Sequence, residues 1–141
     1  MPGNKAPAKT KVQPLRLADA ARGIRHVFVR DFVTAARIGA YQSENGRTQK
    51  VRINIDLAVN EESAALTDRL EDVVCYDRVV ADIKTIIAAG HINLVETLAE
   101  RIAGMALQDH RVVSVRVRVE KLQAVEGAAS VGVEVERERS C

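Results

Sequence analysis

The chain has 141 residues, of which 47% are hydrophobic and only 3% are aromatic, and its formal net charge is +2. This length predicts a single domain, since domains usually contain roughly 100–200 residues, and the composition predicts a core of Val, Ile, Leu and Ala. No stretch approaches the roughly 20 apolar residues of a membrane span, and the amino terminus lacks the apolar run of a secretory signal. We therefore expect no membrane partner.

Residues 1–22 differ in composition from the rest of the chain. They contain five basic residues and one acidic residue, a balance of +4, so the remaining residues carry −2. All three prolines also lie there, and large apolar residues are scarce. This composition predicts a disordered basic tail, followed by one folded domain over residues 23–141. Five dispersed charges without interleaved aromatic residues are weak evidence for a nucleic-acid site, and we expect no nucleic-acid partner.

The cysteines and histidines give no sign of a metal site. Cys75 and Cys141 are the only cysteines, and their placement predicts neither a disulfide framework nor a zinc site, so a reducing cytoplasm is the simplest expected location. His26, His91 and His110 are isolated and lack the spacing of metal ligands. The glycines form no phosphate-binding loop, and no serine or cysteine lies in a nucleophile motif. We expect no metal and no cofactor.

The first half of the folded part predicts two strands and a helix. Residues 26–38 are rich in β-forming residues, and residues 51–59 alternate between apolar and polar side chains, which is typical of strands. Asn45-Gly46 marks the connection between them as a turn. The first helix follows, and Gly90 can end it in a left-handed conformation. Its apolar face contains Tyr76, Val79, Val80, Ile83, Ile86 and Ile87.

The second half predicts another helix and two more strands. Residues 94–107 form the helix, with Asn93 as its N-cap and Glu96 as the partner in a capping box. Residues 112–120 and 131–135 alternate as strands do. The expected buried face of the 112–120 strand consists of Val113, Val115, Val117 and Val119.

The element order is therefore strand, strand, helix, helix, strand, strand. It predicts an α+β fold, a four-stranded antiparallel sheet with two helices on one face. Such a sheet leaves two strand edges and one face uncovered. Association of several copies into a closed ring would cover them, so we expect a homo-oligomer.

Lys121 occupies the next position in the buried phase of the 112–120 strand. Burial disfavours the charged form of a lysine, so an inward-facing Lys121 would accept a proton more readily near neutral pH. The alternative is that the strand ends before this position and the side chain extends into solvent. Periodicity by itself favours that alternative.

Polar residues at the ends of the predicted elements occur in an order that is typical of one protein family. The matching text is Ile-Gly-Ala-Tyr followed by Glu44 and Gln49, then Val-Cys-Tyr76, then Asn-Leu-Val-Glu96-Thr-Leu-Ala-Glu, and finally Val-Glu-Lys121 before Ala-Ser-Val-Gly-Val-Glu-Val-Glu. Each piece alone is weak evidence, but together they extend from about residue 24 to residue 137. This set resembles the dihydroneopterin aldolase family.

The resemblance implies the tunnelling fold, whose subunits join their sheets into rings of four that often stack as octamers, with sites at subunit interfaces. It also implies a retro-aldol reaction of folate biosynthesis, in which 7,8-dihydroneopterin yields 6-hydroxymethyl-7,8-dihydropterin and glycolaldehyde. Neither a metal nor a Schiff base is required, because the dihydropterin ring accepts the electrons. The protein orients the ring and moves protons.

The resemblance also implies a role for each matching residue. Lys121 is the expected general acid/base, and Glu96, helped by the backbone of Val95, is expected to bind the amino-pyrimidinone edge of the pterin. Tyr76 is expected to contact substrate from the neighbouring subunit, and Glu44 to lie near the reacting side chain. Without the resemblance, helix capping would explain Glu96, core packing would explain Tyr76, and a solvated loop would explain Glu44.

The residue after the lysine departs from the aldolase pattern. Aldolases of this family commonly have proline there, whereas this chain has Leu122. A Lys-Leu-x-Ala sequence is associated with the related dihydroneopterin triphosphate 2'-epimerase, which cleaves the same bond and re-forms it with opposite configuration. A triphosphate calls for a basic cluster, but only Arg47 and Lys50 lie in the matching loops, and Glu126 has the opposite charge. We therefore expect an unphosphorylated substrate.

A third hypothesis is a subunit of this fold that binds a pterin or purine without turnover. Binding alone requires only the carboxylate of Glu96. The presence of Lys121 as well argues for catalysis.

Overall fold

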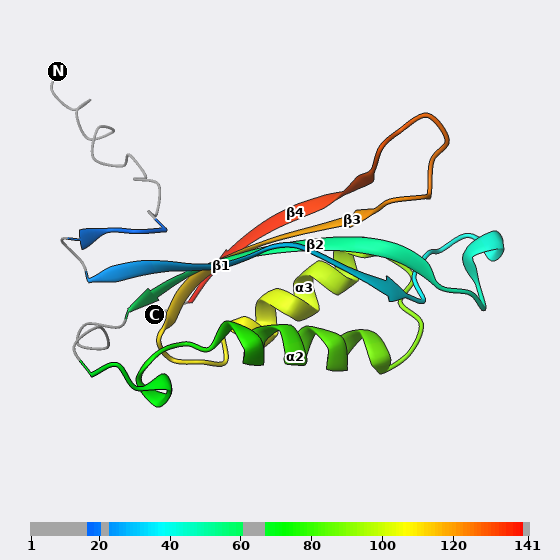
Figure 1. The fold of residues 1–141 in the computed structure, drawn as a ribbon. Helices are drawn as coiled ribbons and strands as arrows, with labels where there is room; N and C mark the ends of the chain where they lie inside the picture. The colour runs from blue at the N-terminus through cyan, green and yellow to red at the C-terminus, as the bar shows by residue number, and fades with distance from the viewer. Residues whose placement is uncertain (1–16, 21–22, 61–66, 140–141) are drawn as a thin grey trace, which may run out of the picture.

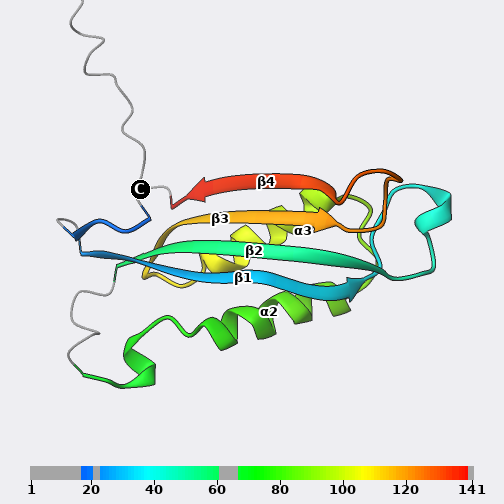
Figure 2. The ribbon, with the colours of Figure 1, turned by 45° about the horizontal axis from the view of Figure 1, so that its top comes forward.

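The computed structural model describes residues 17–20, 23–60 and 67–139. The strands are β1 (Ile24–Ala36), β2 (Gln49–Asn60), β3 (Val112–Lys121) and β4 (Val131–Glu138), the helices are α2 (Tyr76–Ala88) and α3 (Val95–Ala106), and two short 3-10 helices are η2 (Gln42–Glu44) and η4 (Leu70–Asp72). The strands form one antiparallel sheet in the order β1-β2-β3-β4. Both helices cover the same face of it (Figures 1 and 2). The predicted α+β architecture is confirmed.

Most of the predicted tail, residues 1–16 and 21–22, lies outside the described residues, as does Cys141. Within the described segment 17–20, Asp19 forms an antiparallel bridge with Ile24. None of the described helices is long and apolar enough to cross a membrane.

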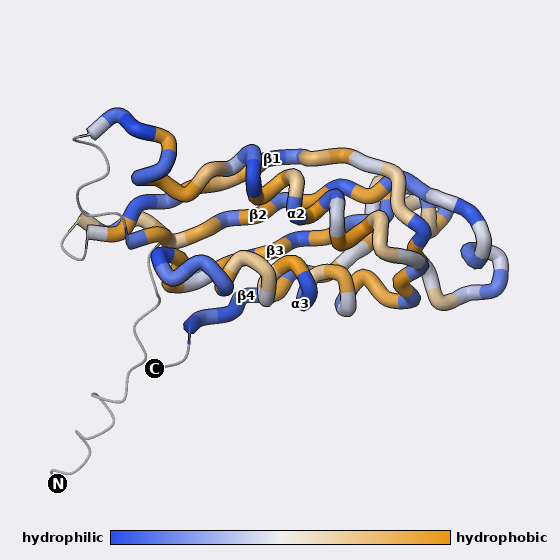
Figure 3. Tube along the Cα trace, turned by 90° about the horizontal axis from the view of Figure 1, so that it is seen from below, coloured by the Kyte–Doolittle hydropathy of each residue, from blue (hydrophilic) through white to orange (hydrophobic). Residues whose placement is uncertain are grey.

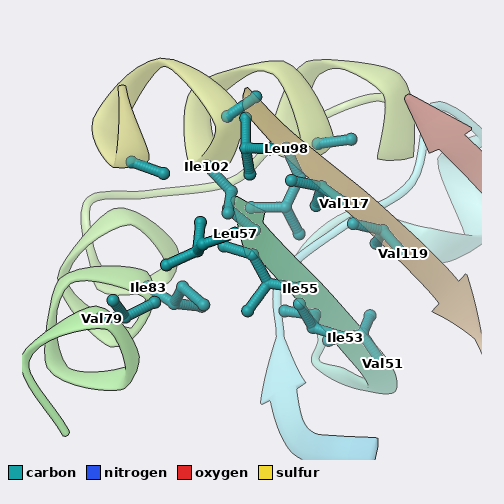
Figure 4. Close-up of a cluster of buried hydrophobic side chains, with 14 of the residues drawn as sticks. Val51, Ile53, Ile55, Leu57, Val79, Ile83, Leu98, Ile102, Val117 and Val119 are labelled. Atoms are coloured by element: carbon teal, nitrogen blue, oxygen red, sulfur yellow. The ribbon is translucent and has the colours of Figure 1, made fainter. Parts of the chain in front are cut away.

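The core lies between the sheet and the two helices. Since side chains alternate between the faces of a strand, every second residue of β2 and β3 points toward the helices (Figure 4). Hydrophobic residues concentrate in the strands and helices, whereas the connection from β1 to β2 is hydrophilic (Figure 3). The largest fully buried side chains include Ile53, Ile55 and Leu57 of β2, Val115 and Val117 of β3, Ile83 of α2, and Leu98 and Ile102 of α3.

The first strand begins and ends two residues earlier than the predicted range of 26–38. Ile38 leaves the sheet and forms a parallel bridge with Ile92, in the connection between the helices. Within β1 the register shifts between Val29 and Phe32. Asp31 has a φ of 52° at this bulge, and its N–H donates to Asn54 Oδ1 at 2.9 Å. The bulge explains why the alternation along this strand is imperfect.

The buried face of β3 starts one residue earlier than predicted. The register between β2 and β3 shifts where Ala58 pairs with Ser114 and Val59 pairs with Val112. Val112 is therefore buried and Val113 is only partly buried, so the prediction for Val113 is wrong. Beyond this irregularity, the predicted alternation holds to the end of the strand.

The predicted capping box at the start of α3 is also wrong. Leu94, with φ −122° and ψ 141°, is the N-cap residue, and no side chain caps the helix. Asn93 consequently lies one position outside the cap, and Glu96 is the second residue of the helix instead of the third. Glu96 is therefore not explained by helix capping.

Candidate active site

Lys121 is the last residue of β3 and continues its buried phase. It pairs in register with Val51 of β2, its side chain is only 15% exposed, and its Nζ lies 2.8 Å from Glu44 Oε2. The interpretation in which Lys121 extends freely into solvent is wrong.

Glu44 ends the short helix η2 and is buried, with 6% of its surface exposed. Its Oε2 accepts hydrogen bonds from Lys121 Nζ and from Gln49 Nε2, each at 2.8 Å, and its Oε1 accepts one from the Tyr41 N–H at 3.2 Å. Gln49 Nε2 also donates to the Ile38 carbonyl at 2.7 Å. The alternative of a solvated loop charge is therefore wrong for Glu44.

Gly39 provides the space for this carboxyl group. Its φ is 135°, a conformation that residues with a side chain rarely adopt, and a Cβ placed on it would lie 2.1 Å from Glu44 Cδ. Any other residue would collide with the Glu44 side chain. The glycine in the Ile38-Gly39 sequence is thus required by the position of the carboxylate.

The hydrogen bond from Lys121 is the largest influence on the acidity of Glu44. Together with the bonds from Gln49 and Tyr41, it lowers the pKa of Glu44 from 4.5 to about 2, against the opposing effect of burial. Glu44 is therefore an anion at neutral pH. The site contains a buried ammonium–carboxylate pair with a proton donor in contact with its acceptor.

Glu120 holds the end of β3 from the other face of the sheet. Its carboxylate accepts bonds from Arg52 Nε at 3.0 Å and Nη2 at 2.8 Å, and from Ser130 Oγ at 2.6 Å. These bonds, that of Arg52 above all, lower the pKa of Glu120 to about 2. On the far side of Lys121, the Leu122 N–H donates to the Lys50 carbonyl at 3.1 Å. Proline, which lacks an N–H, cannot form that bond.

Glu96 and Val95 form the first turn of α3, at the same end of the molecule as η2 and the end of β3 (Figures 1 and 2). The Gly39 N–H donates to the Ile92 carbonyl at 2.9 Å, which joins the segment before α3 to the segment under Glu44. Glu96 is exposed and makes no ion pair with any side chain in the described ranges. Since the first N–H groups of a helix lack intrahelical acceptors, this turn presents donors beside a free carboxylate.

Tyr76 lies at the opposite end of the molecule. It begins α2 and is 61% exposed, so the explanation by core packing is wrong. It lines an open pocket of about 490 Å³ together with Val27, Phe28 and others. Val27 belongs to the same row of the sheet as Val115, which is six residues from Lys121 and therefore about 20 Å away at roughly 3.3 Å per residue.

The structure thus brings together Lys121, Glu44 and the first turn of α3, and leaves Tyr76 apart. Sequence reasoning assigned no role to Gln49. Its position two residues before Val51 continues the alternation of buried residues in β2, which could have predicted a buried side chain. Sequence reasoning missed Glu120 because only the β2–β3 register reveals its partner. In the described part of the chain, no three His, Cys, Asp or Glu side chains are grouped so that they could hold a metal ion.

Comparisons with known proteins identify relatives of this chain. A family model described as dihydroneopterin aldolase matches residues 27–136. Dihydroneopterin aldolase of Escherichia coli K12 is 31% identical over 111 residues, which cover 79% of this chain and 91% of that protein.

Two solved structures also resemble the chain. The crystal structure of E. coli dihydroneopterin aldolase in complex with neopterin has a TM-score of 0.76 at 30% identity and covers 80% of this chain and 98% of its own. That of a dihydroneopterin aldolase from Burkholderia thailandensis, bound to guanine, has a TM-score of 0.75 at 35% identity and covers 84% and 93%.

The two buried carboxylates predict how stability depends on pH. The folded-state pKa of Glu44 and of Glu120 is about 2, below the ordinary 4.5. Their contribution is therefore fully present above pH 4.5 and is lost as the pH falls toward 2. Glu44→Gln should flatten this dependence, so the unfolding free energies of variant and wild type should converge as the pH falls. Urea unfolding at several pH values measures this.

Glu126→Gln, a change at an exposed loop position, is the matched control and should leave the pH dependence unchanged. A Glu44→Gln protein that lost stability with acid as steeply as the wild type would contradict the buried pair.

Proposed function

The chain belongs to the dihydroneopterin aldolase family, and on that premise we propose that it cleaves 7,8-dihydroneopterin by a retro-aldol reaction through Lys121 and Glu96. The observation that carries this proposal is the buried pair of Lys121 and Glu44, 2.8 Å apart, at the end of the molecule where α3 begins. A proton-transfer group and a free carboxylate for binding the ring therefore share one end of one subunit.

The chemistry requires a proton to leave one position of the substrate and another to arrive elsewhere. The carbon–carbon bond of the side chain breaks, its hydroxyl loses a proton and becomes the carbonyl of glycolaldehyde, and the electron pair enters the C=N bond of the ring. The carbon left on the ring then gains a proton. Lys121 can both donate and accept, since its Nζ is stable with three protons or two. The proton that Lys121 takes from the hydroxyl is the one it gives to the carbon left on the ring. Glu44, which is an anion, fixes the position of Nζ at 2.8 Å.

Glu96 supplies the binding of the ring. Two parallel N–H donors on the amino-pyrimidinone edge match one carboxylate, and the Val95 N–H at the start of α3 is a donor for the ring carbonyl. Neopterin and guanine, the ligands named in the two solved relatives, both have this edge. Their shared edge supports a pterin as the ligand of this chain.

The position of Tyr76 supports the proposal that the site is shared between copies of the chain, in a homo-tetramer or homo-octamer. The row of the sheet that contains Val27, which lines the same pocket as Tyr76, is about 20 Å from Lys121 along the strand direction. One pterin is too short to touch both within one subunit. Strands β1 and β4 are the two edges of the sheet, and pairing them between copies would close a ring. Such a ring would enclose the helix-free face, with its ion pairs of Arg30 with Asp56 and of Arg118 with Glu134.

The epimerase remains the second candidate because Leu122 follows the lysine. Against it, Arg47 Nε is already bonded to the Ser43 carbonyl at 2.8 Å, and Lys50 alone offers little charge for a triphosphate. We therefore assign unphosphorylated dihydroneopterin as the substrate. Competition between it and its triphosphate, with released aldehyde trapped, separates the two activities.

A cytoplasmic location stays a prediction from cysteine usage.

Lys121→Ala and Glu96→Ala should fail in different ways. Lys121→Ala should lower kcat by about 10²–10⁴, the range for loss of a general acid/base, while the affinity for neopterin is largely kept. Glu96→Ala should mainly weaken pterin binding, by about 1.5–3 kcal/mol for a charge-assisted contact. Glycolaldehyde release from 7,8-dihydroneopterin and calorimetric titration with neopterin measure the two effects.

Lys121→Arg is the matched control, because it keeps the charge but cannot release a proton near neutral pH. It should not restore turnover. A wild-type protein that releases no glycolaldehyde would refute the aldolase, and a near-normal kcat in either lysine variant would refute the role of Lys121.

Mixing of variants tests the shared site. Tyr76→Ala and Lys121→Ala should each be nearly inactive alone, because each removes one component from every site. In oligomers assembled from equal amounts of both, roughly a quarter of the sites receive both native residues if the site lies between two symmetric copies. Activity should therefore reappear on co-assembly. Mixed oligomers no more active than the separate variants would contradict a shared site.

A further inference from the structure

His91 lies in the connection between α2 and α3. This connection is at the same end of the molecule as the carboxyl end of β3 (Figure 2). His91 Nε2 is 2.8 Å from the Gly39 carbonyl oxygen. Because a carbonyl oxygen only accepts, Nε2 must carry the hydrogen, which assigns the tautomer of the ring. The other ring nitrogen, Nδ1, is buried and has no hydrogen-bond partner among the described residues.

The bond from His91 reaches the residue on which Glu44 rests. Gly39 lies so close under the Glu44 carboxyl group that a Cβ would be 2.1 Å from its Cδ. Beside this bond, the Gly39 N–H donates to the Ile92 carbonyl at 2.9 Å, and the Ile92 N–H donates to the Arg37 carbonyl at 2.9 Å. Ile92 therefore holds the N–H group of Gly39, and His91 holds its carbonyl group.

The same connection continues directly into the first turn of α3, where Val95 and Glu96 lie. His91 consequently joins the segment that presents Glu96 to the segment that supports Glu44. Burying the unpaired Nδ1 atom of His91 disfavours the fold. An aromatic hydrocarbon ring would fill similar space without that cost. What imidazole adds at this position is the Nε2–H donor to Gly39.

We propose that His91 is a positioning residue, which through Gly39 sets the place of the Glu44–Lys121 pair relative to the first turn of α3. It touches neither substrate nor the reacting atoms. The inference rests on the proposed function of Lys121 and Glu96, because its consequence is the alignment of a ring bound at α3 with the group that moves protons. Small misplacements of that kind lower the rate of the chemical step while binding is kept.

Two amide variants differ in reach and test the proposal. Gln places its amide nitrogen near the position of Nε2 and can still donate to Gly39, whereas the shorter Asn places it near Nδ1 and cannot. His91→Asn should lower kcat by about 10-fold with KM changed less than about 2-fold, a moderate case of misplacement. His91→Gln should keep most of the wild-type kcat. His110→Asn, at an exposed position, is the control and should change neither constant.

A second measurement does not depend on turnover. Loosening of Gly39 should weaken the bond from Lys121 to Glu44, so the pKa of the Glu44 carboxyl, about 2 in the wild type, should rise in His91→Asn and not in His91→Gln. Carbon-detected NMR titration of Glu44 measures it. The proposal would be overturned if His91→Asn and His91→Gln had the same kcat and the same Glu44 pKa. This holds whether the two variants resemble the wild type or are both altered. A wild type without turnover, in which the Glu44 pKa still separated the variants, would refute the aldolase and leave the positioning role standing.

Discussion

The ion pair of Lys121 and Glu44 joins residues 77 positions apart in the chain, and the local structure around both depends on it. Removing one partner from a buried pair leaves an uncompensated charge, which is strongly destabilising. The surrounding residues reduce that risk: Gly39 makes room for the carboxylate, and Gln49 gives it a second donor. The arrangement keeps the Lys121 side chain in a partly buried place, only 15% exposed.

The placement of Tyr76 and Glu96 at opposite ends of the molecule follows from the topology. Because α2 and α3 run antiparallel across one face of the sheet, their first turns lie at opposite ends (Figure 1). Tyr76 and Glu96 each begin one of these helices. The shared site proposed above would bring these two residues together at each junction of a ring closed through the edge strands β1 and β4.

Local periodicity was sufficient to predict the element order, because that order depends on neighbours in the sequence. For Lys121 periodicity favoured extension into solvent, and only the family resemblance favoured a functional role for it. Periodicity failed at Val113, where a register shift changes the phase, and at Asn93, where the cap lies one residue later. The partner of Lys121 was beyond its reach, since Glu44 arrives from a loop 77 residues earlier. The contact of His91 with Gly39 was equally hidden, because 52 residues separate them.

Single-turnover cleavage of dihydroneopterin by Glu44→Gln tests most directly whether this ion pair governs the chemistry. The variant keeps the size of the side chain and removes the negative charge that contacts Lys121 Nζ at 2.8 Å. We predict a chemical step slower by roughly 10–10²-fold, as expected for a misaligned proton-transfer group, with neopterin affinity essentially unchanged. A single-turnover rate equal to that of the wild type would contradict the account.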